Sequence, residues 1–197
     1  MLIDNRQKKI GITGSIGAGK TFISNIFINL GIPVFNADFE AKKYMVENKL
    51  LKQKIKSIFG DKVYENGMLQ NKLLAEIVFN NKYKLEKLNN LVHPIVKKGF
   101  DDWCYKQESK IIIKEAAILF ESNSYLDLDK IICVSAPKDI RIDRVINRDN
   151  ISREQVIARM EKQMVQEEKE KLSNFIIVND EKELLLPQIL NIIAQIK

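Results

Sequence analysis

The 197-residue sequence is poor in several features, and each shortage excludes a class of protein. Its two cysteines, Cys104 and Cys133, lie far apart and match no C-x-x-C pattern, so we expect neither a disulfide framework nor a zinc site. The longest apolar run, Ala116 to Phe120, is far too short to span a bilayer. The polar start, Met1 to Lys9, lacks the apolar stretch of a signal peptide. Together these shortages predict a cytoplasmic protein in a reducing compartment, with no membrane partner.

Arginine is also scarce, and its distribution is informative. The chain has 26 lysines but six arginines, and five of the six fall between residues 141 and 159. The guanidinium group of arginine is planar, always charged and able to bind phosphate through two hydrogen bonds. A cluster of arginines in a chain that otherwise uses lysine therefore indicates phosphate binding. The net charge of +6 would also suit nucleic acid or a membrane surface. However, acidic residues are interleaved with these arginines, which argues against a nucleic-acid surface. A solvated, salt-bridged helix face remains the alternative for any single arginine.

One motif is complete. Residues 14–21 spell G-S-I-G-A-G-K-T, the G-x-x-x-x-G-K-[ST] phosphate loop, between a short apolar strand and a helix with one apolar face. Its glycines let backbone N–H groups turn inward around phosphate at a helix N-terminus. Lys20 would reach the β- and γ-phosphates, and the Thr21 hydroxyl could take one position on Mg²⁺. The predicted ATP contacts in this loop are Ser15, Ile16, Gly17, Ala18, Gly19, Lys20 and Thr21.

Strand-like runs recur along the chain with helical patterns between them. Most of these runs are nearly continuous in apolar residues, as in parallel strands covered on both faces, and their connections are long enough for crossover helices. The pattern predicts an α/β fold with a five-stranded parallel sheet flanked by helices. The predicted strands are Lys9–Thr13, Ile32–Phe35, Lys110–Lys114, Lys130–Ser135 and Phe175–Val178.

Two segments interrupt the simple alternation of strands and helices. Residues 38–109 have helical spacing with one turn, too long for a single crossover, and predict a helical subdomain that binds the acceptor. Residues 137–172 predict two helices, the second capped by Ser152, that form an arginine-rich lid over the nucleotide. The remaining residues, 1–37, 110–136 and 173–197, would form the phosphate-loop core and end in a helix over Glu181–Ile196. This arrangement is typical of a small-molecule kinase.

Carboxylates at strand ends are the candidates for chemistry, because strand carboxyl ends face the ligand crevice in such sheets. Asp38, after the second strand, could be the base that takes the hydroxyl proton, a partner of Mg²⁺, or only a helix N-cap. Glu115 could lie beside the metal, although a surface position is favoured, and Glu121 could face the crevice. His93 precedes Pro94, which suits a helix start, and is a possible acceptor contact.

At this level of detail the sequence resembles the dephospho-coenzyme A kinase family over nearly its whole length, Ile10 to Asn179. The phosphate loop is shared by many families, whereas the His-Pro pair, the Leu-Phe-Glu element and the Arg-Asp hairpin are more specific. The matching elements include residues 12–21, 30–34, Asn36-Ala37-Asp38, Phe59-Gly60, Gly67-Met68-Leu69, Val78-Phe79, Leu88-Asn89, His93-Pro94, residues 118–121, Arg144, Arg148-Asp149, Ser152, Arg159, Gln163 and Asn179.

The resemblance implies that ATP phosphorylates the ribose 3′-hydroxyl of dephospho-coenzyme A, the last step of coenzyme A synthesis, with Mg²⁺. It implies that Asp38 is the catalytic base and Lys20 a catalytic cation. It also implies that Arg144 and Arg148 are lid contacts to the nucleotide. The acceptor contacts it favours are Asp38, Lys72, His93, Leu119 and Glu121.

Four positions depart from the family pattern. Asn36 stands where the family often has Asp, which weakens a two-carboxylate metal site there. Asn71 replaces a common Arg, whose acceptor contact the adjacent Lys72 could take over. Ala117 replaces a usual Pro, and Asp180 a usual Gly.

Two other functions are also compatible with these residues. One is another small-metabolite or nucleoside-monophosphate kinase. The other is a regulatory ATPase acting on nucleic acid, which the basic charge suggests but the interleaved acids disfavour. The expected partners are small-molecule substrates, and the expected state is a monomer or small homo-oligomer.

Overall fold

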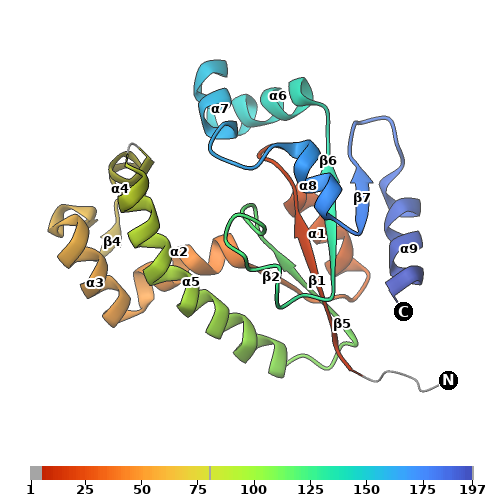
Figure 1. The fold of residues 1–197 in the computed structure, drawn as a ribbon, viewed down its shortest axis with the longest axis horizontal. Coiled ribbons are helices and arrows are strands. Elements are labelled where there is room, and N and C mark those ends of the chain that lie inside the picture. Colours follow the sequence, from red (N-terminus) through yellow and green to blue (C-terminus); the bar gives the residue numbers. More distant parts are fainter. Residues whose placement is uncertain (1–5, 80, 197) are drawn as a thin grey trace. The chain divides into compact units, whose positions relative to one another are not determined.

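The computed structural model describes residues 6–79 and 81–196, and within it the chain forms two compact units (Figure 1). One unit consists of Met1–Asn36 and Gln107–Lys197, and the other of Ala37–Lys106. Among the described residues, no helix has the length and apolar character needed to cross a bilayer.

A five-stranded parallel sheet forms the centre of the first unit, as predicted. The strand order is β2-β5-β1-β6-β7, so the first strand of the chain is central. All five residues of β5 are buried, as expected for a parallel strand covered on both faces. The strands are β1 (Lys8–Thr13), β2 (Val34–Asn36), β5 (Ile111–Glu115), β6 (Lys130–Ser135) and β7 (Phe175–Val178).

β2 begins two residues later than the predicted Ile32 because the preceding helix end extends further. Gly31 has a φ of 80°, and the Ile32 N–H donates to the Phe27 carbonyl across it. This bond caps the carbonyl end of α1 (Lys20–Asn29), so Ile32 belongs to the helix-terminating turn.

One face of the sheet is covered by α1 and α9 (Leu185–Ile196). Their apolar sides enclose a buried cluster that includes Ile12, Phe27 and Ile192. α9 begins four residues later than the predicted Glu181, because the Asp180 carboxylate accepts the N–H groups of Lys182 and Glu183 and holds a turn there. Pro187 then lies in the first helical turn, where its missing N–H costs nothing.

The opposite face carries α8 (Gln166–Leu172), whose Gln166 amide donates to the Cys133 sulfur in β6. Burial raises the pKa of that thiol to about 11, so it stays protonated and unreactive. A crossover helix was predicted between β5 and β6. Instead residues 116–129, all of them described, form turns. Gly11 on β1 lacks a side chain, which lets Leu119 and Leu128 of this segment pack directly onto the strand.

The segment 137–172 contains three helices where two were predicted: α6 (Lys138–Asp149), α7 (Arg153–Met160) and α8. Ser152 caps α7 as predicted, in a capping box in which its hydroxyl accepts the Gln155 N–H. Apolar residues of α6 and α7, with Ile142 and Val156 at the centre, form a small core of their own.

A carboxylate ties α6 to α7. Asp149 accepts from the Arg148 Nε at 2.7 Å and from the Arg159 Nη1 at 2.7 Å. The hydrogen bond from Arg148 is the largest of the effects that hold the pKa of Asp149 below its ordinary value of 3.8. The arginines are largely exposed, so the tie contributes modestly to stability.

The second unit is mostly helical, with a small antiparallel hairpin. The hairpin turns at Asn66 and Gly67, whose φ angles of 49° and 84° suit a two-residue turn. Its elements are α2 (Ala37–Glu47), α3 (Lys49–Phe59), η1 (Asp61–Val63), β3 (Tyr64–Glu65), β4 (Met68–Leu69), α4 (Asn71–Phe79) and α5 (Lys82–Tyr105).

The predicted helix start at His93-Pro94 is wrong. Both residues lie in the middle of α5, which begins instead behind Asn81, whose side chain accepts the Lys84 N–H. Burial of Val92, Val96 and Phe100 on one side of α5 holds the helix together across the proline. Packing therefore overrides the local tendency of proline to interrupt a helix.

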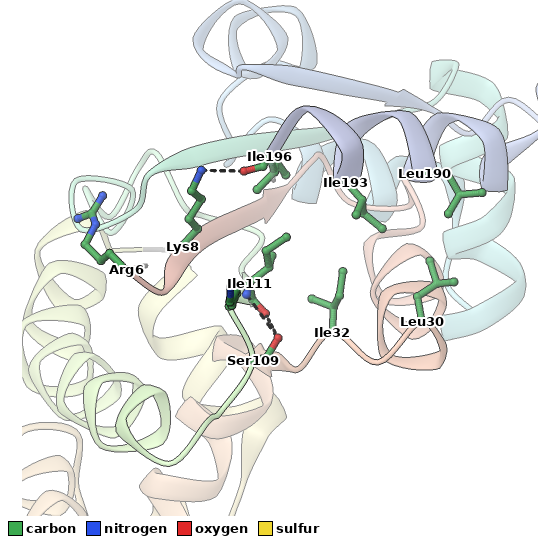
Figure 2. Close-up of a pocket in the computed structure, with 10 residues that line it drawn as sticks. Arg6, Lys8, Leu30, Ile32, Ser109, Ile111, Leu190, Ile193 and Ile196 are labelled. Atoms are coloured by element: carbon green, nitrogen blue, oxygen red, sulfur yellow. Dashed lines mark hydrogen bonds between the residues drawn. The ribbon is translucent and has the colours of Figure 1, made fainter. Parts of the chain in front are cut away.

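A pocket of about 520 Å³ opens at the end of the sheet where β1 and β5 begin (Figure 2). Its lining combines leucines and isoleucines with polar residues such as Arg6 and Ser109, and Lys8 donates to the Ile196 carbonyl at the end of α9. Because β1 runs from this pocket toward the phosphate loop, the two lie at opposite ends of the strand. The pocket is therefore distinct from the nucleotide site described next.

We expect Phe27→Ala to destabilise the protein by about 3–5 kcal/mol, because Phe27 is 1% exposed in the core under α1. Urea unfolding of the variant measures this loss. The control is Ile28→Ala on the same helix, at a side chain that is 50% exposed, with an expected change of about 0.5 kcal/mol or less. Equal losses in both variants would contradict the assigned core.

Asp149→Asn should lower stability by about 1 kcal/mol or less near neutral pH, by weakening the tie between α6 and α7. Since the folded-state pKa of Asp149 is lowered, its contribution is present above about pH 4 and is lost as pH falls through the folded pKa. The difference between wild type and variant should therefore shrink below about pH 4. Urea unfolding of both proteins from pH 7 downward tests this, and a pH-independent difference would contradict it.

Candidate nucleotide site

The phosphate loop occupies the turn between β1, which ends at Thr13, and α1, which begins at Lys20. Gly17 and Gly19 adopt left-handed φ angles of 80° and 93°. Side chains at these two positions would collide with the Arg141 backbone and with the Asn179 amide. The glycines are therefore required both for the turn and for the close approach of neighbouring segments.

Lys20 folds back over the loop that precedes it. Its Nζ donates to the Gly14 carbonyl at 2.9 Å and to the Ser15 carbonyl at 3.3 Å. This holds the ammonium above the loop at the N-terminus of α1, where the helix dipole is positive. The arrangement concentrates positive charge at the point where a phosphate would bind.

Glu115 lies at the end of β5 opposite Asn36 of β2 and Ile12 of β1. Its side chain accepts from the Thr21 hydroxyl at 2.8 Å and from the Asn36 amide at 3.1 Å. The favoured sequence interpretation, a surface strand end, is wrong for Glu115, which is 3% exposed. The register of the sheet brings it beneath the start of α1, and sequence alone does not specify that register.

Thr21 and Glu115 offer the hard oxygen ligands that Mg²⁺ prefers. The described residues contain no cluster of three or more His, Cys, Asp or Glu side chains suited to a metal ion. A magnesium ion that arrives with nucleotide needs only one or two protein oxygens, because phosphates and waters supply the others. The residues present therefore fit a nucleotide-borne Mg²⁺ and not a dedicated all-protein metal centre.

Arg144 connects α6, the phosphate loop and the segment after β7. Its Nη2 donates to the Asn179 carbonyl at 3.1 Å, and it pairs with Glu181 at 3.0 Å. Its Nη1 lies 3.5 Å from the Gly17 carbonyl. Asn179 completes the connection, since its buried amide donates to the Ala18 carbonyl at 2.8 Å. Arg144 is thus held against the loop.

The other arginines of α6 differ from Arg144. Arg141 is buried and donates to the Ala136 carbonyl, and desolvation lowers the pKa of its guanidinium. Arg148 is exposed and engaged with Asp149. The three share one helix face by spacing, yet Arg144 hydrogen-bonds to the Gly17 carbonyl of the loop, whereas Arg141 and Arg148 engage Ala136 and Asp149. Their different burial could not be predicted from the i, i+3, i+7 pattern.

The predicted acceptor residues of the first unit lie in the turns after β5. Leu119 is fully buried against Gly11 and shapes this segment from within. Glu121 accepts from the Lys169 ammonium at 2.9 Å and from the Met164 N–H at 2.9 Å. Lys169 is itself fully buried, and its Nζ also donates to the Ala117 carbonyl at 2.6 Å.

The other predicted residues belong to the second unit. Asp38 is the second residue of α2, exposed in its first turn. The helix begins at Ala37, so Asp38 is inside the helix and is not its N-cap. Lys72 is exposed near the start of α4, and His93 lies within α5. The structure brings Thr21, Lys20, Arg144 and the loop together in the first unit.

Sequence reasoning passed over several residues that contact the loop. Asn179 and Gln163 both match the family pattern without a predicted role, although the position of Asn179 directly after β7 could have indicated one. Gln163 and Gln166 accept the Ile16 and Ser15 N–H groups from about 150 positions away. No local pattern predicts such long-range contacts.

Comparisons with known proteins show which family the chain resembles. A family model described as dephospho-CoA kinase matches residues 8–184. The dephospho-CoA kinase of Bacteroides fragilis is 38% identical over 187 residues, covering 94% of this chain and 91% of that protein. The dephospho-CoA kinase of Porphyromonas gingivalis is 37% identical over 192 residues, covering 95% and 94%.

Two solved structures resemble the chain over almost its full length. A crystal structure of a Thermus thermophilus protein is 31% identical with a TM-score of 0.88, covering 98% of this chain and 99% of that one. A dephospho-CoA kinase from Campylobacter jejuni is 32% identical with a TM-score of 0.68, covering 95% and 96%. The resemblance predicted from the motifs is confirmed, and the chain belongs to the dephospho-CoA kinase family.

Proposed function

We propose that this chain transfers the γ-phosphoryl group of ATP to the ribose 3′-hydroxyl of dephospho-CoA, giving CoA and ADP in the last step of CoA synthesis. The observation that carries the proposal is the match of residues 8–184 to the dephospho-CoA kinase model, which includes the whole phosphate loop. The geometry of that loop supports it, because its glycines, Lys20 and Thr21 are arranged as a phosphate cradle requires.

In this proposal the loop and its helix hold the triphosphate. Lys20 places its charge on the β- and γ-phosphate oxygens, where negative charge must be neutralised during transfer. Thr21 and Glu115 are the residues that would hold Mg²⁺. The metal, when bound with ATP, supplies further neutralisation of the phosphate oxygens. The Asn36 amide, which donates to Glu115, orients that carboxylate without adding a second negative charge.

Arg144 and Arg148 are proposed nucleotide contacts on the segment 137–172, which we propose acts as a lid. Support for Arg144 comes from its bonds to Asn179 and its approach to Gly17, which already place it beside the loop. Arg148 would have to leave its pair with Asp149 to reach a phosphate. Since that pair is exposed, the cost of breaking it is modest.

The proposed base is Asp38, which follows β2 by two residues at the start of α2. Its carboxylate would accept the proton of the 3′-hydroxyl as the oxygen attacks the γ-phosphorus and the bond to ADP breaks. We propose that residues 38–109 bind the acceptor, with Asp38, Lys72 and His93 as contacts. Glu121 would contribute from the turns after β5, and Leu119 through the shape of those turns. We also predict that the protein is located in the cytoplasm and that it is a monomer or a small homo-oligomer.

An acceptor panel tests the proposed reaction. ADP release is measured with dephospho-CoA, AMP, dTMP and shikimate at equal concentrations, with ATP and Mg²⁺ present. We expect dephospho-CoA to give a much higher kcat/KM than the other three acceptors. Comparable rates with AMP, dTMP or shikimate would reject the assignment in favour of a different small-molecule kinase.

Asp38→Asn should bind ATP as well as wild type but lose most of its turnover, on the order of 100-fold or more, because the hydroxyl proton has no acceptor. Nucleotide titration and steady-state kinetics measure the two effects separately. Circular dichroism of the variant checks that α2 is intact. Turnover within a few-fold of wild type would leave Asp38 with a structural role in the first turn of α2.

A further inference from the structure

Two glutamines, Gln163 in the segment before α8 and Gln166 at the first position of α8, bind the beginning of the phosphate loop. The Gln163 Oε1 accepts the Ile16 N–H at 2.9 Å, and the Gln166 Oε1 accepts the Ser15 N–H at 3.0 Å. We propose that Gln163 and Gln166 are positioning residues that hold the phosphate loop in the conformation that binds ATP. The inference rests on the proposed function in one respect, that this loop is the nucleotide site.

The chemistry of Gln166 suits this role. Its side chain is 5% exposed, and its Nε2 donates to the Val134 carbonyl at 3.3 Å and to Glu170 at 2.9 Å while its oxygen accepts from Ser15. An amide carries both donors and an acceptor at the end of one side chain, without a charge. A neutral acceptor also avoids placing a negative charge beside a loop that must attract phosphate.

The segment that carries the glutamines is itself anchored. The Met164 N–H, between the two glutamines, donates to Glu121, and the same carboxylate oxygen accepts from Lys169. Lys169, which is fully buried, also donates to the Ala117 carbonyl. These bonds tie residues 163–169 to the turns after β5. The glutamines therefore belong to the part of segment 137–172 that is bonded to the sheet unit.

The phosphate loop also contacts the helices α6 and α7, which precede the glutamines in the chain. Ile16 packs against the apolar core of α6 and α7, and Gly17 lies against the Arg141 backbone. The Ala18 N–H donates to the Ser15 carbonyl at 3.1 Å, which closes a turn directly after the residues that the glutamines hold. In this proposal the N–H groups offered to phosphate begin at Gly17, and Ser15 and Ile16 shape the cradle from behind.

Removing one of these acceptors should weaken nucleotide binding in a defined way. The Ser15 N–H is in a buried residue, so its loss of a partner favours other loop conformations. Nucleotide binding must then select the competent conformation from several, which lowers the apparent affinity. We expect an effect on the order of tenfold.

The test uses Gln163→Met and Gln166→Met, which keep the side-chain length and remove the amide. MgADP binding is measured by titration calorimetry, so the result does not depend on which acceptor the enzyme uses. We expect roughly tenfold weaker MgADP binding in each variant. Hydrogen exchange of the amides in residues 14–18 should be faster, and the KM for dephospho-CoA should change less than about twofold.

A matched control separates positioning from general damage. Gln155→Met removes a bond of the same kind at the start of α7, where the Gln155 oxygen accepts the Ser152 N–H at 3.0 Å. Gln155 does not contact the phosphate loop. The Gln155→Met variant should bind MgADP like wild type.

The proposal is overturned if Gln163→Met and Gln166→Met bind MgADP like wild type, or weaken it no more than Gln155→Met does. Thermal unfolding accompanies each titration. If Gln166→Met does not fold, Gln163→Met decides, because its substitution removes the hydrogen bond to Ile16 and leaves the buried Gln166 in place.

Discussion

The conformation of the turn between β1 and α1 is the constraint on which the rest of the first unit depends. Six residues must end a buried strand, expose N–H groups and begin a helix, and this requires left-handed backbone at Gly17 and Gly19. A turn so rich in glycine has little rigidity of its own. Hydrogen bonds from the surrounding residues make the turn rigid. They come from Lys20, Asn179, Arg144, Gln163 and Gln166. The helices after β6 therefore form part of the wall of the loop.

Much of this fold could be predicted because the sequence is locally consistent. Nearly continuous apolar runs identified the five strands, with Lys130–Ser135 and Phe175–Val178 correct to the residue. Ser152 was recognised as a cap because a side-chain oxygen at that position satisfies a nearby N–H group. The phosphate loop was evident because its chemistry requires specific residues at specific positions. In each case a few adjacent residues contain the whole physical cause.

The features that were missed have causes that lie far away in the sequence. Glu115 is buried beneath Thr21 because of the register between β5, β1 and β2, and a strand end by itself does not indicate its neighbours. Pro94 was taken for a helix start, but burial of the surrounding residues of α5 outweighs its local preference. Gln163 matches the family pattern and Gln166 does not stand out, but no neighbouring residue indicates that either contacts the loop, because the fold brings them there from about 150 positions away.

The strand order has a consequence for how the protein is made. β1 is synthesised first yet lies at the centre of the sheet, and its partners begin at Ile111 and Lys130. At ribosomal speed both edges of β1 wait on the order of ten seconds for those strands. The helical unit, Ala37–Lys106, is continuous in sequence and is complete before either partner emerges. We therefore expect it to fold first, while the nascent nucleotide site depends on chaperones or on its own lysines to keep an unpaired apolar strand from aggregating.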